Sequence, residues 1–142
     1  SMFRGGLLAR AWAILNGCYF VSACPGEGSV FINPLGKVLA ESSRSSGLTT
    51  TRQINMDFEV FHLDRNNMFL EQLQRRYDGR QEFEIAHAEG LFMLSSLDQQ
   101  LTAEDIAREM EFENLVSYFA RSRHVRDKAL RREFLPPGPP MW

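Results

Sequence analysis

The residue best placed to carry chemistry is Cys24, which ends an uncharged stretch (CYFVSAC) and precedes a glycine loop (PGEG). A thiol becomes a nucleophile only when a nearby base or cation favours its deprotonation. Glu27, in the loop, is acidic, and no His or Lys lies close by in the sequence. We therefore favour a packed, inert thiol over a nucleophile at this position.

The other reactive residue types lack the spacing that builds a site. His62, His87 and His124 form no HxH or HxxxH pair, so we expect solvated or hydrogen-bonded histidines rather than a zinc site. The serines of SSRSSG lack the GxSxG pattern of a nucleophile elbow. The PGEG loop lacks the GK[ST] continuation of a phosphate-binding loop. The sequence therefore implies no catalytic residue, no metal and no cofactor.

A basic stripe near the end of the chain is the last candidate. Its members are Arg121, Arg123, Arg126, Lys128, Arg131 and Arg132. A concentrated stripe of this kind binds anions or nucleic acid, but Asp127 and Glu133 dilute the charge here. We favour a solvated helix face and expect no nucleic-acid partner.

Composition bounds the class of protein. The 142 residues suit one domain, and 44% apolar with 24% charged residues is typical of a soluble globular chain. The net charge of -2 gives no general attraction to nucleic acid or to a membrane surface. No apolar run approaches the roughly 18–20 residues that span a bilayer. Two cysteines too far apart for a disulfide along one strand, and no signal peptide, predict a reduced, cytoplasmic protein.

The first element expected to position these residues is a helix over residues 3–16. Its apolar residues recur at helical spacing, namely Leu7, Leu8, Ala11, Ile14 and Leu15, with Trp12 beside them. Gly17 follows, where a glycine in the left-handed conformation commonly ends a helix. The pattern therefore predicts a helix that stops at residue 17.

Three strands are expected next. Residues 18–24 are short, aromatic, β-branched and uncharged, which predicts a strand buried on both faces. Residues 29–33 and 37–41 are the second and third strands, and the Asn-Pro-Leu-Gly sequence of residues 33–36 carries turn chemistry between them.

The rest of the chain is expected to alternate strands with helices. The expected elements are a loop over 42–47, a Thr-rich strand over 48–55, a helix over 63–77, a strand pair over 82–87 and 90–95, and a helix over 102–110. Thr102 and Asp105 predict a capping box for the last of these.

Several alternatives stay open in this half. An extended tail could replace the strand pair, and residues 113–134 form either one bent helix or two. Asp64 is a candidate cap for the helix over 63–77, whose Phe69, Leu70, Leu73 and Tyr77 share a face.

Two blocks of the sequence resemble the carbon–nitrogen hydrolase (nitrilase) superfamily. ARAWAILNGCYFVSAC is similar to the family's helix and strand (RARAIENGCYVV), and GSVFINPLGKVLAES is similar to its G-S-x-I-x-x-P-x-G-x-V-L-A hairpin. The matching positions are Ala9, Arg10, Ala11, Asn16, Gly17, Cys18, Tyr19, Gly28, Ser29, Ile32, Pro34, Gly36, Val38, Leu39 and Ala40. The later RQINMDFE resembles the strand that ends the family's shared core, so the resemblance covers roughly residues 3–60.

The resemblance implies hydrolysis of nitriles, amides or carbamoyl groups by a Glu base, a Lys and a Cys nucleophile, without metal. Attack needs a thiolate, and the tetrahedral anion needs a nearby cation. In the family this set precedes the helix, and no C-Y-D or C-W-E motif occurs here. Cys18 matches a non-catalytic position and Lys37 belongs to the hairpin, so no catalytic residue carries over. Ala23, Cys24 and Pro25 fall at the strand end that borders the family's pocket.

The resemblance also sets the expected fold class, which is α/β. Family members look like an α-β-β-α sandwich, and this chain corresponds to half of one, with a helical C-terminal tail. Residues 1–60 are the nitrilase-like core segment, residues 61–134 a partly helical variable extension and candidate subunit contact, and residues 135–142 a Pro-rich tail. Half a sandwich leaves an apolar sheet face exposed, so we expect a homo-oligomer or a complementary catalytic chain as partner.

Two functions from different classes follow. The first is the C-terminal portion of a hydrolase acting on a small-molecule amide or nitrile, inactive alone and supplying pocket wall and subunit contacts. The alternative is a non-catalytic interaction or regulatory remnant that binds through its exposed sheet face and helical tail. The resemblance does not identify the substrate.

Overall fold

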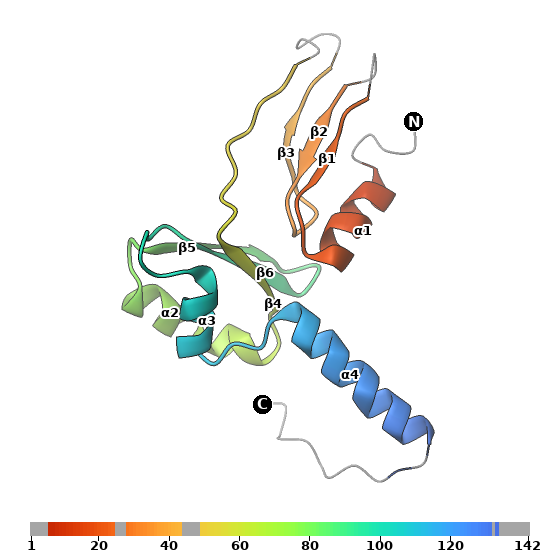
Figure 1. Cartoon of the computed structure of the whole chain (residues 1–142), viewed down its shortest axis with the longest axis vertical. Helices are drawn as coiled ribbons and strands as arrows, with labels where there is room; N and C mark the ends of the chain where they lie inside the picture. The colour runs from red at the N-terminus through yellow and green to blue at the C-terminus, as the bar shows by residue number, and fades with distance from the viewer. Residues whose placement is uncertain (1–5, 25–27, 44–48, 132, 134–142) are drawn as a thin grey trace. The chain divides into compact units, whose positions relative to one another are not determined.

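The computed structural model describes residues 6–24, 28–43, 49–131 and 133. The chain divides into two compact units, residues 1–56 and residues 57–142, and each contains a three-stranded antiparallel sheet (Figure 1). The described chain is therefore mixed α/β, and it has two units where its length alone suggests one domain. The boundary expected after residue 60 falls within the first strand of the second unit.

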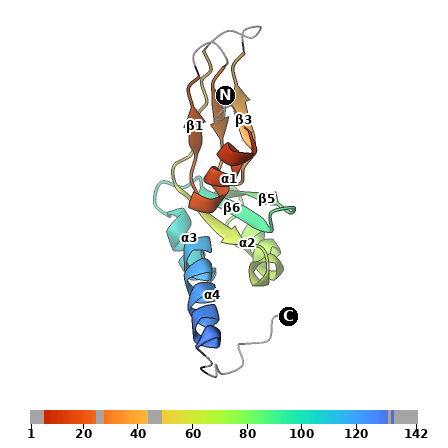
Figure 2. The ribbon, with the colours of Figure 1, turned by 90° about the vertical axis from the view of Figure 1, so that its right-hand side faces the viewer.

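The first unit is a helix followed by a meander of three strands. Helix α1 (Leu7–Asn16) precedes β1 (Phe20–Ser22), β2 (Val30–Ile32) and β3 (Val38–Glu41), and the strands lie in the order β1-β2-β3. Both ribbon views show α1 beside this sheet (Figures 1 and 2). The predicted helix, first strand and hairpin are confirmed in that order.

Helix α1 ends at the predicted glycine. Gly17 has a φ of 56°, in the left-handed region where glycine has no Cβ to clash. Its N–H donates to the carbonyl of Ile14 at 3.2 Å, and the N–H of Cys18 donates to that of Ala13 at 3.1 Å. These two bonds form a Schellman motif, which satisfies carbonyls that the end of a helix leaves unpaired. The start predicted at Phe3 lies outside the described residues.

Helix α1 packs on the sheet through its small residues, which the spacing of its large residues does not predict. Ala9 and Ala13 are buried in one cluster with Val30 and Ile32. Small side chains one turn apart let the helix approach the strands closely. Ile14 is half-buried, and the other large apolar side chains are exposed, namely Leu7, Leu8, Trp12 and Leu15. The helix is therefore apolar on two opposite faces.

Strand β1 is shorter and more exposed than predicted. Pairing with β2 covers Phe20–Ser22 rather than residues 18–24. Val21 points to the face opposite Phe20 and is 55% exposed, and its cross-strand partner Phe31 is half-buried. The prediction of burial on both faces is therefore wrong. An uncharged strand is buried on both faces only where other secondary-structure elements pack against each face of its sheet.

The predicted turn between β2 and β3 is confirmed, and it is held by one buried side chain. The Oδ1 of Asn33 accepts hydrogen bonds from the N–H groups of Leu35 and Lys37 at 3.1 and 2.9 Å. Gly36 has a φ of 78°, and a Cβ there would lie 2.7 Å from the Cδ1 of Ile14 in α1. The turn therefore favours an amide side chain and a glycine at these positions.

The Thr-rich segment that follows is not a strand. The predicted strand spans residues 48–55, but residues 49–56 have no regular secondary structure. Threonine favours a strand only where a neighbour offers backbone groups, and no described strand pairs with this segment. The loop expected over residues 42–47 lies, after Ser43, outside the described residues, and so does the tail of 135–142.

The second unit is a sheet with helices between and after its strands. In chain order its elements are β4 (Phe58–His62), the 3-10 helix η1 (Arg65–Phe69), α2 (Leu70–Arg76), β5 (Gln81–Ala86), β6 (Leu91–Ser96), α3 (Ala103–Glu109) and α4 (Leu115–Leu130). The strands lie in the order β4-β6-β5, all antiparallel. The β5–β6 hairpin confirms the predicted strand pair over the extended tail.

One face of this sheet packs with α2 and α3 around the main core of the unit. The rings of Phe61 and Phe92 stack with centroids 5.0 Å apart, and Phe112 meets both at steep angles. Leu73 of α2 and Ile106 of α3 are fully buried in the same cluster. The shared face predicted for the helix over 63–77 is confirmed, since Phe69, Leu70, Leu73 and Tyr77 all belong to this core.

The helix ends show which local signals hold. Thr102 accepts a hydrogen bond from the N–H of Asp105 at 3.1 Å, and the Asp105 carboxylate accepts from the N–H of Thr102, so the predicted capping box is confirmed. Residues 63–77 form η1 and then α2 rather than one helix, and Asp64 gives no side-chain cap. Residues 115–130 form one continuous helix.

Helix α4 has little contact with the rest of its unit. Leu115, in its first turn, is the one buried residue among the sixteen of this helix. Both ribbon views show α4 running away from the sheet of the second unit (Figures 1 and 2). The described residues at its N-terminal end therefore do most to hold it in place.

Candidate functional site

The predicted pocket residues lie just after β1. Ala23 is exposed, Cys24 is half-buried, and Pro25 lies outside the described residues. The hydroxyl oxygen of Ser22 is 3.2 Å from the sulfur of Cys24. A hydroxyl is too weak a base to take the thiol proton, so this contact does not activate the sulfur. Neither Cys18 nor Cys24 is part of a disulfide.

The three histidines lie in different surroundings. His87 in the β5–β6 turn and His124 on α4 are exposed, as predicted for solvated histidines. His62 at the end of β4 is 7% exposed, and neither ring nitrogen has a hydrogen-bond partner. The prediction of a solvated or hydrogen-bonded side chain is therefore wrong for His62. Because burying an unpaired imidazole is costly, its surroundings form the candidate site.

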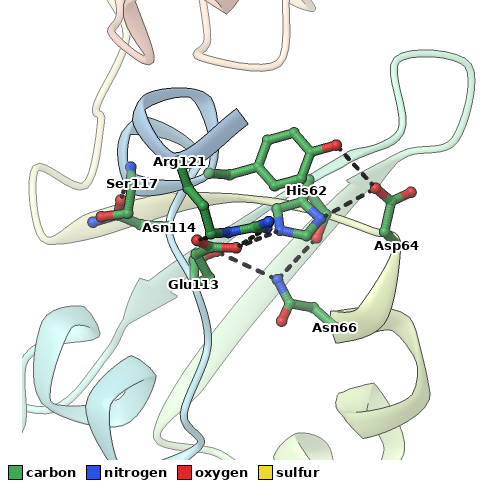
Figure 3. Close-up of polar contacts among 8 residues, drawn as sticks. His62, Asp64, Asn66, Glu113, Asn114, Ser117 and Arg121 are labelled. Carbon is green, nitrogen blue, oxygen red and sulfur yellow. Dashed lines mark hydrogen bonds and ion pairs between the residues drawn. The ribbon is translucent and has the colours of Figure 1, made fainter. Parts of the chain in front are cut away.

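Two carboxylates face the two ring nitrogens of His62. The Nδ1 atom lies 3.6 Å from Oδ2 of Asp64, and Nε2 lies 3.7 Å from Oε2 of Glu113 (Figure 3). Both distances exceed a hydrogen bond but fall within the range of an ion pair. Across the described part of the chain, no group of three or more His, Cys, Asp and Glu residues could hold a metal ion.

Two residues of α4 complete the cluster. The ring of Tyr118 lies against the imidazole with centroids 4.0 Å apart, and its hydroxyl is 3.4 Å from Oδ2 of Asp64. Arg121 donates two hydrogen bonds to the carboxylate of Glu113, at 2.8 and 2.7 Å. These bonds lower the pKa of Glu113 below its ordinary value of 4.5, although burial opposes the shift. Glu113 is therefore ionised even in mildly acidic solution.

Asparagine side chains fix the backbone around this cluster. The amide of Asn66 donates to the carbonyl of His62 at 3.0 Å, where the chain turns after β4. Asn114 caps α4, since its side chain accepts from the N–H of Ser117 at 2.9 Å. Asn114 also forms an isolated antiparallel bridge with Phe61. The start of α4 is thereby held at the end of β4 (Figure 3).

This arrangement suits an electrostatic role better than a catalytic one. A catalytic imidazole must lie within hydrogen-bond reach of a substrate atom, and the side chain of His62 is only 9% exposed. An open hollow does occur on the described surface, along η1 and α2, but all its lining residues are exposed. They are Met68, Glu71, Gln72, Arg75 and Arg76. Neither place encloses a small molecule.

Sequence reasoning misses the His62 cluster because its members are far apart in the chain. His62 ends one strand, Glu113 precedes the last helix, and no periodic pattern links them. One signal was available: Phe58, Val60 and His62 alternate along β4 and share one face of the sheet. A histidine on an otherwise apolar face calls for a polar partner from another element.

Four residues of the basic stripe, Arg121, Arg123, Arg126 and Lys128, lie on α4, as predicted. Arg131 follows the end of the helix, and Arg132 lies outside the described residues. Part of the charge of the stripe is already paired. Arg121 binds Glu113, and a guanidinium nitrogen of Arg126 lies 3.8 Å from Oδ1 of Asp127. Both arginines are exposed. These pairs agree with a solvated helix face.

Comparison with protein-family models, curated proteins and solved structures finds no match to this chain. The nitrilase resemblance therefore stays a prediction, together with the substrate class and the partners that it implies. In the described ranges, no helix has the length and apolar character needed to cross a membrane.

Proposed function

We propose that this chain is the C-terminal portion of a nitrilase-like carbon–nitrogen hydrolase that acts on a small-molecule amide or nitrile. Another polypeptide supplies the catalytic Glu, Lys and Cys, and the first unit supplies pocket wall and subunit contact. Support comes first from the blocks over residues 9–24 and 28–42 that resemble the family. The observation that carries the proposal is that the first unit exposes apolar surface on both its helix and its sheet.

The sheet of the first unit presents an apolar face on the side opposite α1. Val30 and Ile32 point to α1, so Val21, Phe31 and Ala40 share the other face. Val21 is exposed, and the other two are half-buried. In the proposed fold, a second sheet covers this face and completes an α-β-β-α sandwich, of which residues 1–60 form half.

The outward face of α1 is a second apolar surface. Leu7, Trp12 and Leu15 are 84%, 60% and 71% exposed. A soluble chain rarely presents several large apolar side chains together unless another surface covers them. We therefore assign this face to contact with a second copy or with the complementary catalytic chain.

The chemistry requires a separate source for the catalytic set. The thiolate must attack the nitrile or amide carbon, and a cation must stabilise the anion that forms. The two lysines of the sequence are Lys37 and Lys128. Lys37 follows the β2–β3 turn, at the opposite end of the sheet from Cys24, and Lys128 lies on α4. The chain alone is therefore expected to be inactive.

Ammonia release from simple amides and nitriles tests the proposal. The chain should release none alone, and should release ammonia when joined to an upstream reading frame that encodes Glu, Lys and a C-Y-D or C-W-E motif. An upstream frame without that set contradicts the hydrolase assignment. If the chain alone releases ammonia and Cys24→Ala abolishes this activity, the nucleophile is Cys24. That result would overturn the proposal that another polypeptide supplies the catalytic set.

Light scattering after size-exclusion chromatography tests the contact surface. The wild-type chain should form a dimer or larger assembly, and Leu15→Glu should reduce its mass to that of a monomer. Leu130→Glu is the matched control, because Leu130 is 75% exposed on α4. A compact wild-type monomer contradicts the assigned contact.

A second candidate function is the non-catalytic interaction or regulatory remnant. It is favoured by α4, which is exposed along most of its length and carries Val116 and Leu130, 74% and 75% exposed. On this alternative, Leu130→Glu rather than Leu15→Glu disperses the assembly, and no upstream frame confers ammonia release.

A further inference from the structure

We propose that one exposed side of α4 docks an acidic amphipathic helix of a partner protein. The inference deepens the second candidate function, on which it rests, by naming the class of partner that α4 binds. It concerns the second unit alone and does not depend on the hydrolase proposal. It is carried by the pattern of apolar and basic side chains along this helix.

Five exposed side chains line up along α4, and we call them the α4 seam. Their spacing alternates between three and four residues, which places them on one side of an α-helix, as in a coiled coil. At 1.5 Å per residue the seam is about 21 Å long. Its members are Val116, Phe119, Arg123, Arg126 and Leu130.

The α4 seam lies away from the contacts that attach the helix to the rest of the unit. Tyr118 stacks on His62, and Arg121 binds Glu113. At 3.6 residues per turn, Arg121 projects from the side of α4 opposite the seam. Both ribbon views show the helix running away from the sheet of its unit (Figures 1 and 2). A partner helix can therefore cover the seam without displacing the contacts that hold α4.

The two ends of the seam are apolar and its middle is basic. Val116 and Phe119 lie at one end and Leu130 lies at the other, while Arg123 and Arg126 lie between them. A wholly apolar partner would bury two guanidinium groups without counter-charges, which costs free energy. Carboxylates at the facing positions would instead form charge-assisted hydrogen bonds with them. The seam therefore fits a helix with apolar residues at both ends of its own seam and acidic residues between them.

The charge of α4 favours the same partner. The helix carries four basic side chains and one acidic side chain, a net charge of +3, in a chain whose net charge is -2. The pair of Arg126 and Asp127 is exposed, with its nitrogen and oxygen 3.8 Å apart, so the guanidinium stays accessible to a partner carboxylate. Positive potential is concentrated at α4, where it attracts and orients an acidic partner.

Other occupants fit the seam less well. A second α4 would set the two seam arginines against the same two arginines. Helices α2 and α3 of a second copy already bury their apolar residues in the core, and α1 has no acidic residue. A membrane surface would meet an apolar side that is interrupted by two arginines. Nucleic acid would pair with the arginines but leave the apolar ends uncovered.

Fluorescence anisotropy of a labelled designed peptide, added to the full chain, tests the proposal. The probe is a helix of about five turns with six seam positions. The central two are Glu and the outer four are Leu, so that it fits in either direction. A control peptide has Lys at the central two. The chain should bind the Glu peptide about tenfold more tightly than the Lys peptide. Equal binding, or no binding of the Glu peptide at about 100 μM chain, overturns the proposal.

Charge reversal in the protein separates docking on the seam from general attraction. Arg123→Glu combined with Arg126→Glu should weaken binding of the Glu peptide about tenfold and should invert the preference in favour of the Lys peptide. Lys128→Glu combined with Arg131→Glu is the matched control, because both residues lie off the seam. This control should change binding less than about threefold. An equal loss in the two double variants, or a preference that does not invert, overturns the proposal.

Single-stranded DNA of about 20 nucleotides is the competing probe. The wild-type chain should bind it more weakly than the Glu peptide. Tighter binding of the DNA, lost in the double variant of the seam, would make the seam a nucleic-acid site and would overturn the proposal. Peptide binding is measured independently of ammonia release and of the mass of the chain, so failure here is distinguishable from failure of either candidate function.

Discussion

The two units bury a three-stranded sheet in different ways. The second packs large side chains, among them Phe61, Leu73 and Phe92, between its sheet and two helices. The first buries a cluster in which two of the four members, Ala9 and Ala13, are alanines. Apolar burial contributes about 25 cal/mol per Å². The second unit therefore carries far more of its own stabilisation, and the first depends on whatever covers its outward faces.

The largest expected effect is in the second unit. Phe92→Ala should lower the free energy of unfolding of this unit by about 3–5 kcal/mol, because Phe92 is fully buried and contacts two other rings. Urea unfolding followed by far-UV circular dichroism measures the loss. Val116→Ala, on exposed α4, should change it by less than about 0.5 kcal/mol. A Phe92→Ala loss below about 1 kcal/mol would remove the contrast between the units.

A substitution under α1 tests the first unit. Ala13→Leu should cost about 1–3 kcal/mol, because the larger side chain must push α1 away from the strands. Thermal unfolding followed by the fluorescence of Trp12, with Trp142 replaced by Phe in all variants, reports on this unit. Leu15→Ala changes an outward-facing residue of the same helix and should have little effect on the melting temperature when the chain is monomeric. Equal effects of the two variants contradict packing through the alanines.

The β2–β3 turn should be sensitive to one amide. Asn33→Ala removes the acceptor of two backbone N–H groups and should cost about 1–2 kcal/mol. Asn67→Ala is the control, because Asn67 is exposed. Chemical denaturation measures the free energy of unfolding of both variants. If Asn33→Ala leaves this free energy unchanged, the prediction is contradicted, and water must replace the side chain as acceptor in this turn.

The smallest effect concerns Glu59 on β4. Burial first, and then the charges of Glu104 and Asp57, raise the pKa of Glu59 above its ordinary value of 4.5. The ionised carboxylate therefore destabilises the folded state above this raised pKa and has no such effect below about pH 4.5. Glu59→Gln should raise the melting temperature slightly at pH 7, and this gain should vanish at pH 4. A gain that persists at pH 4 contradicts the electrostatic cause.

Features that depend on neighbouring residues were predictable from the sequence. Gly17 ends α1, Asn33 and Gly36 form the turn, and Thr102 with Asp105 caps α3. Each rests on a few backbone groups within one turn of chain, so the residue types alone specify the geometry.

Features that depend on distant partners were not predictable. The spacing of large residues in α1 indicates an apolar stripe but not that the alanine face packs on the sheet. The threonines of residues 49–51 favour a strand, yet no described neighbour pairs with them. His62 gains its carboxylates from a turn and from a segment beyond two further strands. In each instance the sequence does not indicate which part of the chain packs against the residue in the folded structure.

The sheet of the second unit stops at β5, and no described strand lies along its outer edge. Glu82 and Glu84 alternate there with Phe83 and Ile85, which face the core cluster. An unpaired edge strand can form backbone hydrogen bonds with the same strand of another molecule. Like charges along the strand oppose this pairing. In strong acid those charges are neutralised, so fibril-like stacking of copies should begin at β5 before either unit has fully melted.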